Sequence, residues 1–456
     1  MTAQTILPAN TLSSGGFQVN NSVRFNSADS ADLRISDYSG AGTSRRIRTY
    51  SMWIKRSELS YAVIFGSAGK DHWVFNANNT IQFNIGSGTD SRRVTTRLFT
   101  DVTAWYHLVF AYDTTQGTAA NRFTLWVNGV ETSTAIVGGK NDVQQNEDAL
   151  VFINNDTHTI GSDEDGASYF DGYMAEWVFV DGQKLDADSF GEFDEDSGIW
   201  KPIDVSGITL GTNGFYLDFQ TASDLGIDAG NDNDFEPTNL AATDQATDTC
   251  TNNFCTMNPL IPTTNATFSE GNCKLAIGGS SIQGAGIGTF GLTTGKWYWE
   301  IKLLADKDNH THGVISELTE ELYTNVTAIQ NDGGVTSWIN GDGGEVVVDG
   351  SASTADYGIM AENSIMGIAL DLDNFKITYL DDNSALVSNF NLSAERGTIF
   401  PLIKMGINCT AEVNFGGCSA FAVSSANSDA DGHGNFEHAP PSGYFAICSK
   451  NLAEYG

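Results

Sequence analysis

The chain has 456 residues, of which 40% are hydrophobic and 11% aromatic, enough to fill two or three domain cores rather than one. Its 57 acidic residues outnumber its 23 Lys and Arg, and the net charge of −34 excludes general binding to nucleic acid or anionic lipid. Residues Met1–Phe17 lack the basic and apolar regions of a Sec signal, and no run approaches the roughly 20 apolar residues of a membrane helix. We therefore expect a protein that is made in the cytoplasm and is not inserted into a membrane.

Short strands separated by turn residues occupy the first half of the chain. In order, they are expected at Ser51–Lys55, Tyr61–Phe65, Trp73–Phe75, Ile81–Ile85, Trp105–Tyr112 and Arg122–Val127. Asn128 and Gly129 follow the last strand and favour a type I′ turn, which predicts a hairpin. Five apolar residues are spaced to fill a core between two sheets: Trp105, Leu108, Phe110, Leu125 and Val127.

A less regular stretch, about Asp186 to Pro262, is rich in Asp, Asn, Thr and Gly. It contains one expected strand, Gly214–Phe219, and the one expected helix, a short one at Asp186–Phe190. We expect this stretch to be a connector held against its neighbours rather than a free linker.

Strands resume in the second half of the chain. They are expected at Lys296–Leu303, Ile365–Leu372, Phe375–Leu380, Thr398–Lys404 and Thr410–Phe415. The third is followed by Asp381-Asp382 and then by Asn383–Val387 (NSALV), which predicts another hairpin. All six cysteines lie in this half, at spacings that fit no zinc template. Buried free thiols are expected, with one or two disulfides as the alternative.

Two segments carry a resemblance to laminin-G-like, concanavalin A-like domains. Trp105–Glu131 (WYHLVFAYDTTQGTAANRFTLWVNGVE) resembles the central W-x-H-[LV] and V-N-G strands of that family, and Tyr169–Asp181 (YFDGYMAEWVFVD) resembles its closing segment. The resemblance implies a jelly-roll β-sandwich over residues 21–185.

The C-terminal half resembles a SPRY (B30.2-like) domain, another concanavalin A-like sandwich. The matching segments are GKWYWEIKL at Gly295–Leu303, GIALDLDNFKITYLDD at Gly367–Asp382 and FPLIKMGINCTAEVNFG at Phe400–Gly416. The resemblance implies a second sandwich over residues 263–456. The expected fold class is therefore all-β, with two jelly-roll sandwiches joined by an irregular connector at 186–262.

The order of these domains, with the connector segment Thr247–Leu260 (TDTCTNNFCTMNPL) between them, resembles virion structural proteins of tailed phages, especially marine ones. The resemblance implies a tail or capsid fibre located in the virion, with other virion proteins and a host cell-surface glycan or protein as partners. It also implies a homo-oligomer, with a trimer as the expected form, and assigns residues 1–20 to virion docking. Neither nucleic acid nor membrane insertion is expected.

Some concanavalin A-like sandwiches are glycoside hydrolases, which cleave glycosidic bonds with a pair of carboxyl groups. The nearest paired-carboxylate pattern is Glu192-Phe193-Asp194-Glu195-Asp196, which lacks the final Glu of E-x-D-x-x-E and lies in an acidic connector. Glu176 and Glu300 stand alone on their strands, where each is expected to face solvent or to hold a turn. His107 is expected to be a structural histidine. We therefore expect a non-enzymatic protein without a certain cofactor.

Calcium is the candidate ion, because laminin-G-like domains often carry one at the rim. The carboxylates expected to bind it lie in three acidic loops: Asp163 and Asp165, Asp232 and Asp234, Asp429 and Asp431. Each loop has a solvated turn as its alternative. His310 and His312, with Asp308, form a weaker candidate for another metal.

The candidate ligand-binding residues lie in the second sandwich, where SPRY domains bind through loops at one end. They are Trp338, Asn340, Asp342 and Tyr357, of which Trp338 is expected in a glycine-rich loop (SWINGDGG).

The leading hypothesis is a virion fibre that recognises a host surface or glycan through lectin-like domains. A purely structural capsid-decoration or tail protein is the first alternative, because fold does not determine function. A glycan-degrading enzyme and a cell-surface adhesin are further alternatives.

Overall fold

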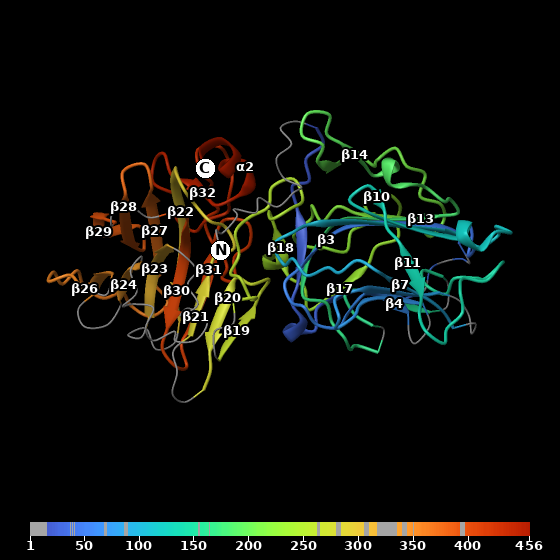
Figure 1. The fold of residues 1–456 in the computed structure, drawn as a ribbon, viewed down its shortest axis with the longest axis horizontal. Coiled ribbons are helices and arrows are strands. Elements are labelled where there is room, and N and C mark those ends of the chain that lie inside the picture. Colours follow the sequence, from blue (N-terminus) through green and yellow to red (C-terminus); the bar gives the residue numbers. More distant parts are fainter. Residues whose placement is uncertain are drawn as a thin grey trace. The chain divides into compact units, whose positions relative to one another are not determined.

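The computed structural model describes residues 16–36, 38, 40, 42–67, 71–85, 90–153, 156–163, 165–261, 265–279, 284–304, 310–316, 335–339, 344–349, 351–392 and 397–456. The chain divides into two compact units, which meet at Thr251 and Asn252 in the sequence. We call the unit that ends at Thr251 the first unit and the unit that begins at Asn252 the second unit. Each is built almost entirely of strands (Figure 1).

The first unit contains two large antiparallel sheets. One runs in the order β10 (Val130–Glu131), β9 (Phe123–Val127), β8 (Tyr106–Asp113), β3 (Ile47–Arg56), β13 (Gly172–Asp181), β1 (Ser22–Phe25) and β18 (Gln245–Ala246), with β16 (Phe215–Leu217) also paired to β13. The other runs β11 (Thr134–Ile136), β7 (Ser91–Thr95), β6 (Ile81–Ile85), β5 (His72–Phe75), β4 (Ala62–Ser67), β12 (Thr157–Ile160), β2 (Asp32–Ser36) and β17 (Glu236–Thr238). The strands expected from the sequence in this region are confirmed.

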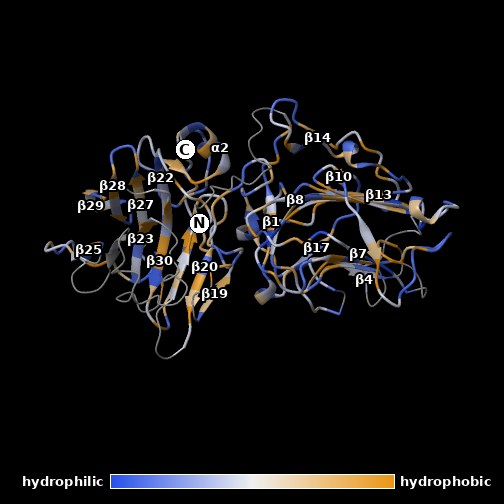
Figure 2. Ribbon diagram, viewed as in Figure 1, coloured by the Kyte–Doolittle hydropathy of each residue, from blue (hydrophilic) through white to orange (hydrophobic). Residues whose placement is uncertain are grey.

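An aromatic-rich core joins the two sheets. Tyr50 on β3 contacts Phe65 on β4 and Trp73 on β5, with both ring centroids 5.1 Å from its own. Leu108, Phe110, Leu125 and Val127 belong to this core, as their spacing predicts. Trp105 is also buried but lies outside this core, and its indole Nε1 donates to Asp248. Figure 2 shows apolar residues along many of the strands. The central strands β3 and β13 are buried along nearly their whole length.

The turn at Asn128-Gly129 takes the predicted form. Val127 pairs with Val130, which leaves Asn128 and Gly129 as the two-residue loop. Both have positive φ, 50° and 76°, as a type I′ turn demands.

Residues 186–251 belong to the first unit, because three of their strands extend its sheets. The β16 strand pairs with β13, β17 pairs with β2, and β18 pairs with β1. The expected short helix is a 3₁₀ turn, η3 (Ala187–Ser189), and β14 (Gly191–Phe193) pairs with β15 (Trp200–Pro202) as a separate ribbon. The remaining 3₁₀ turns are η1 (Ser27–Asp29), η2 (Ala119–Asn121) and η4 (Ala242–Asp244).

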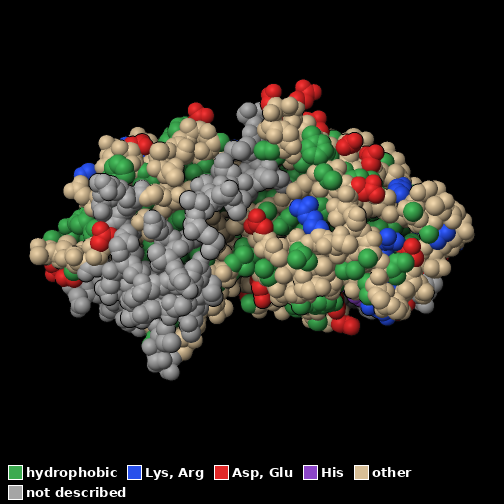
Figure 3. Space-filling model, in the orientation of Figure 1, with side chains coloured by type: hydrophobic (Ala, Val, Ile, Leu, Met, Phe, Trp, Pro, Cys, Tyr) green, Lys and Arg blue, Asp and Glu red, His purple; other side chains and the backbone are tan. Residues whose placement is uncertain are grey.

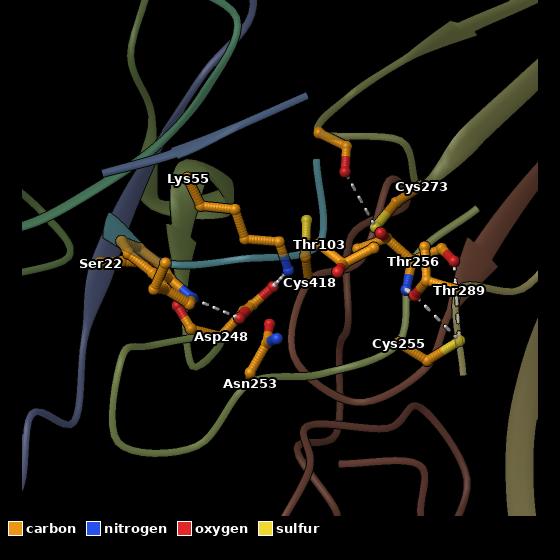
Figure 4. A network of polar contacts seen from close by, with 12 residues as sticks. Ser22, Lys55, Thr103, Asp248, Asn253, Cys255, Thr256, Cys273, Thr289 and Cys418 are labelled. Carbon is orange, nitrogen blue, oxygen red and sulfur yellow. Dashed lines mark hydrogen bonds and ion pairs between the residues drawn. The ribbon is translucent and has the colours of Figure 1, made fainter. Parts of the chain in front are cut away.

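A buried ion pair fixes the end of this stretch to the first sandwich. Lys55 Nζ lies 2.7 Å from Asp248 Oδ2, and their side chains are 2% and 0% exposed. Asp248 Oδ1 also accepts from Trp105 Nε1 at 3.1 Å, and its carbonyl accepts from Ser22 Oγ at 2.7 Å. Figure 4 shows the Lys55 ammonium beside the Asp248 carboxylate. Since a buried carboxylate needs such partners, the position of residues 245–251 is specified by charge as well as by strand pairing.

The second unit is also a two-sheet sandwich. One sheet runs β19 (Ala266–Ser269), β20 (Lys274–Ile277), β31 (Thr410–Asn414), β22 (Lys296–Leu303), β27 (Ile365–Asp371), β28 (Lys376–Asp381) and β29 (Ser384–Asn391), with β32 (Phe445–Ala446) parallel to β22. The other runs β21 (Gly284–Ile287), β30 (Ile399–Met405), β23 (His310–Ser316), β24 (Val335–Ile339), β25 (Glu345–Val348) and β26 (Ser351–Ala352). Residues of both sheets, such as Trp299 and Ile403, share one core.

Two local features of this unit differ from the expectation. The second hairpin turns at Asp382-Asn383 rather than Asp381-Asp382, because Asp381 pairs with Ser384. A short helix, α2 (Ser449–Tyr455), also forms at the end of the chain. Its seven residues are too few for a helical period to stand out in the sequence.

Glu300 on β22 is fully buried rather than facing solvent. Its Oε1 accepts from the backbone N–H of His438 at 2.7 Å, and its Oε2 accepts from that of Glu437 at 3.0 Å. Asn414 Nδ2 donates to Oε2 and Tyr298 Oη donates to Oε1, both at 3.2 Å. Glu300 therefore holds the long segment between β31 and β32, the turn-holding role that the sequence left open.

The six cysteines are buried thiols, as expected: Cys250, Cys255, Cys273, Cys409, Cys418 and Cys448. Cys255 Sγ accepts a hydrogen bond from Thr289 Oγ1 at 3.7 Å (Figure 4). None of the helices among the described residues is both long and apolar enough to cross a membrane. Figure 3 shows acidic side chains distributed over the visible face rather than gathered in a single patch.

Candidate ligand-binding site

A pocket of about 510 Å³ opens in the first unit, beside β16. Its wall is formed by residues 205–212, which lead into β16, by residues 229–231, which follow it, and by Thr43 and Tyr216. The volume lies within the usual range of small-molecule sites, roughly 300–1,000 Å³. All of these wall residues belong to the stretch beyond β13 except Thr43.

The pocket wall alternates polar and apolar groups. Hydroxyl and amide side chains come from Thr43, Ser206, Thr209, Thr212 and Asn231. Apolar and aromatic side chains come from Val205, Ile208, Leu210 and Tyr216. A wall with both kinds of group can hydrogen-bond to a ligand and also contact its non-polar parts.

Tyr216 is held in place by a buried carboxyl group. Its phenol donates to Glu176 Oε2 at 2.6 Å, and Glu176 is 7% exposed. Glu176 lies on β13 with φ of +48°, at the bulge where the pairing of β13 with β3 changes register between Ala175 and Val178. The bulge turns this side chain toward β16 and so makes the contact with Tyr216.

Burial raises the pKa of Glu176 to about 7, and the nearby carboxylates of Asp218 and Asp204 act in the same direction. The Tyr216 hydrogen bond opposes them, because it stabilises the carboxylate. The pKa of Tyr216 is raised by burial and by the negative charge of Glu176. Tyr216 therefore stays a hydrogen-bond donor throughout the ordinary pH range.

A second carboxylate, Asp228, shapes the opposite wall. Its Oδ1 accepts from the backbone N–H groups of Tyr216 and Gly230, both at 2.8 Å, and its Oδ2 accepts from that of Asn233 at 3.1 Å. Its own N–H donates to Asp234 Oδ1 at 2.8 Å. These bonds tie residues 229–231 to β16 through one buried side chain.

Asn231 and Gly230 complete the arrangement. Asn231 Nδ2 donates to the carbonyls of Gly211 and Gly214, at 3.0 and 2.7 Å, and so fixes the two glycines on the other wall. A Cβ on Gly230 would lie 2.2 Å from Leu210 Cδ1, so a larger residue would displace the wall. The pocket is thus preformed, which lowers the entropic cost of binding.

The residues that the sequence nominated for ligand binding do not form a described site. Asn340 and Asp342 lie outside the described residues. Trp338 lies within β24, paired on both sides by β23 and β25, so its expected place in a loop is wrong. The glycines that suggested a loop come after the strand. Tyr357 is half-buried and packs against the core of the second unit.

The carboxylates nominated for calcium serve mainly in turns. Asp163 accepts from the N–H of Asp165 at 2.9 Å, and Asp234 is bonded to Asp228. Asp232 is exposed. Within the ranges that the structure covers, no three His, Cys, Asp or Glu side chains are grouped to hold a metal ion.

The third acidic loop is the most fully hydrogen-bonded. Asp429 Oδ1 accepts from the N–H groups of Asp431 and His433, and its Oδ2 accepts from Ala446 N and Asn451 Nδ2, at 2.8 to 3.0 Å. Asp431 accepts from the Tyr455 phenol at 2.7 Å. These contacts join the loop to α2, and calcium binding stays a prediction.

His310 and His312 both face the core of the second unit and are fully buried. His310 Nδ1 lies 3.1 Å from His312 Nε2. Asp308, their expected third ligand, lies outside the described residues. Burial lowers the pKa of His312 well below its ordinary value, so this imidazole is neutral.

The carboxylates of the hydrolase pattern are used in ion pairs. Lys201 Nζ lies 3.1 Å from Asp194 Oδ2 and 3.3 Å from Glu192 Oε1. Hydrogen bonds from Ser197 and Lys201 lower the pKa of Asp194 to about 2. A general acid for glycoside cleavage needs the opposite shift, so this arrangement favours a structural role.

His107 is a structural histidine, as expected. Its Nε2 lies 2.9 Å from Ser51 Oγ, and its Nδ1 accepts from Trp200 Nε1 at 2.9 Å. Its ring stacks on Trp53, and burial lowers its pKa to about 3.

Sequence reasoning missed the pocket because its residues fall in the stretch interpreted as a connector. The signals were present but weak: Gly211 and Gly214 before β16, and the polar run from Asp228 to Asp234 after it. These two segments meet around Tyr216 through hydrogen bonds of Asp228 and Asn231, which no local sequence pattern predicts.

Comparisons with known proteins agree with the fold of the first unit. Residues 21–188 match the model of the concanavalin A-like lectin/glucanases superfamily. Two solved structures are similar to part of the chain, each at 13% identity and a TM-score of 0.30. They are the TRIM65 PSpry domain, covering 35% of this chain and 91% of that one, and the SPRY domain of human HERC1, covering 36% and 99%. No curated protein matches the chain. The family match confirms the expected all-β class with a concanavalin A-like domain in residues 21–188.

Proposed function

We propose that this protein is a non-catalytic binding protein, and that the pocket beside Tyr216 is its ligand site. The observation that carries the proposal is the preformed wall: Glu176 and Asp228 fix the two sides before any ligand arrives. Both carboxyl groups are engaged with the protein itself rather than presented to the pocket as an acid and base pair. The concanavalin A-like lectin/glucanases match supports a carbohydrate- or protein-binding role.

We further propose that the binding role is exercised in a virion fibre that recognises a host surface. Support comes from the resemblance of the domain order and of residues 247–260 to phage structural proteins. The high negative charge, −34 in total, suits a protein that remains soluble outside cells in a salty medium. A structural capsid or tail protein is the competing assignment.

The binding proposal is tested with two tryptophan variants of the full chain. Ala229 is an exposed residue of the pocket wall, so Ala229→Trp fills the pocket from a position that tolerates size. Ala120, exposed on η2, provides the matched control Ala120→Trp. Wild type and control are expected to bind candidate host cells, whereas Ala229→Trp is expected to lose at least tenfold in affinity. Equal binding by all three proteins would show that the pocket is not the ligand site.

The virion assignment is tested separately, by electron microscopy of the source particle with antibody labelling of this chain. Labelled density projecting from the tail or capsid supports a fibre. Labelled density buried between capsid or tail subunits supports the structural alternative, and absence of label contradicts both.

A further inference from the structure

The pocket wall contains no charged side chain among the described residues. Its polar groups are hydroxyls and one amide, from Ser206, Thr209, Thr212, Thr43 and Asn231. A charged ligand group would therefore lose its hydration without gaining an ion-pair partner, which is costly. Uncharged hydroxyl or amide groups, by contrast, can exchange water for these side chains at little net cost.

Carboxylates surround the pocket although none lines it. Asp204 precedes the wall residue Val205, and Asp232 follows the wall residue Asn231. Asp218 lies two residues beyond Tyr216 and, with Asp204, raises the pKa values of both Tyr216 and Glu176. The field at the pocket is therefore negative, and it opposes the approach of an anion.

Three carboxylates near the pocket are already engaged by the protein, so they are poorly placed to bind a cation there. Asp228 already accepts three backbone hydrogen bonds at 2.8 to 3.1 Å. Glu176 is buried behind the Tyr216 phenol, and Asp204 accepts from the N–H of Ser206 at 2.9 Å. The geometry thus repels anions without offering a bound cation a direct partner.

Tyr216 and its apolar neighbours give the pocket a non-polar surface that a ligand can contact. Val205 and Leu210 are buried in the wall, and Tyr216 is half-buried between the wall and Glu176. A pyranose ring has hydroxyls around its edge and C–H groups on its faces, so it can use both the hydroxyl and amide groups and the aromatic and aliphatic groups of this wall.

We propose that the pocket selects uncharged pyranosides, of one or two sugar rings, over uronic acids and sulfated or sialylated sugars. The inference rests on the proposed binding function of the same pocket. Discrimination comes from the negative surroundings and the uncharged wall, whereas affinity comes from the hydroxyls and Tyr216. Because the repulsion is electrostatic and acts partly through solvent, salt weakens it.

The test is a binding panel of matched oligosaccharides on wild type, Ala229→Trp and Ala120→Trp. The neutral members are gluco-, galacto- and manno-oligosaccharides, and each has a partner that carries a uronic acid or a sulfate. At least one neutral member is expected to bind wild type and the control at least tenfold more tightly than its acidic partner. The gap is expected to shrink when NaCl is raised from about 0.1 M to about 1 M, where the Debye length falls from roughly 10 Å to roughly 3 Å.

The outcomes separate this inference from the binding function. If an acidic sugar binds as tightly as its neutral partner or more tightly, and Ala229→Trp abolishes this binding, the charge selectivity is wrong but the pocket is still the ligand site. Failure of every sugar, while host-cell binding remains sensitive to Ala229→Trp, overturns the ligand class alone. If no sugar binds and Ala229→Trp leaves host-cell binding unchanged, both the ligand class and the assignment of the pocket as the ligand site are wrong.

Discussion

The Tyr216 phenol donates a 2.6 Å hydrogen bond to Oε2 of Glu176, a carboxyl group that the β13 bulge places behind the pocket wall. This bond joins the concanavalin A-like strand β13 to the segment that follows residues 21–188, the part of the chain that matches the family model. The proposed ligand site is therefore built partly on the sandwich of residues 21–188 and partly on residues that follow it.

Changes at Tyr216 separate its ring from its hydroxyl group. Tyr216→Phe keeps the ring, so affinity is expected to change less than threefold, whereas Tyr216→Ala is expected to cost at least tenfold. Since the hydrogen bond lowers the pKa of Glu176, Tyr216→Phe should also move that pKa above about 7. Calorimetric titration with a sugar that binds wild type measures the affinity, and carbon-13 NMR of the Glu176 carboxyl group measures the pKa. Equal losses of affinity in both variants would assign binding to the hydroxyl instead.

Glu176 makes the stability of the first unit depend on pH. Its folded pKa of about 7 lies above the ordinary value of 4.5, so folding binds a proton between these limits. The resulting stabilisation is present below about pH 4.5 and is lost as pH rises through about 7. Glu176→Gln removes this pH dependence. As the pH rises from about 4.5 to about 7, the free energy of unfolding of the variant should therefore rise by on the order of 3 kcal/mol relative to that of wild type. Urea unfolding at several pH values measures it. Glu236→Gln, at an exposed strand position, is the control and should follow wild type.

The Lys55–Asp248 pair should contribute far more to stability than a surface pair. Lys55→Met leaves the carboxylate buried without its ammonium, at an expected cost of about 3–5 kcal/mol. Lys140 pairs with Asp90 at the surface, with side chains 30% and 46% exposed, and Lys140→Met should cost less than about 1 kcal/mol. Similar losses in the two variants, measured by denaturant unfolding, would contradict the role assigned to the buried pair.

Much of the fold could be predicted from the sequence. Alternating apolar residues predicted β22 over Lys296–Leu303 with both ends correct, and Asn128-Gly129 predicted a turn whose two positive φ angles are present. These successes share a cause: period-two burial and turn stereochemistry are local properties of a few residues.

The site could not be predicted in the same way. Glu176 meets Tyr216 across 40 residues, and Asp228 reaches back to the N–H of Tyr216 from a loop. The contact between Glu176 and Tyr216 depends on a β-bulge at Glu176, and no local sequence pattern predicts this bulge. Trp338 shows the converse error, because glycines after a strand were interpreted as evidence against the strand itself.

Glu300 should control the order of the segment between β31 and β32. Glu300→Ala leaves its hydrogen-bond donors in the second unit without their acceptor, so a loss of about 3 kcal/mol or more is expected. Limited proteolysis should then cut within residues 419–445. Glu362→Ala, at an exposed turn, is the control and should be cut no faster than wild type. Unchanged protection in Glu300→Ala would show that other contacts hold the segment.

Hydrogen exchange with and without a bound neutral oligosaccharide tests the central claim most directly, because it locates the ligand on the intact chain. The account predicts slowed exchange in residues 205–216 and 229–231 of wild type and Ala120→Trp, and no slowing in Ala229→Trp. Slowing confined to other residues, or retained in Ala229→Trp, would contradict the assignment of the Tyr216 pocket as the ligand site.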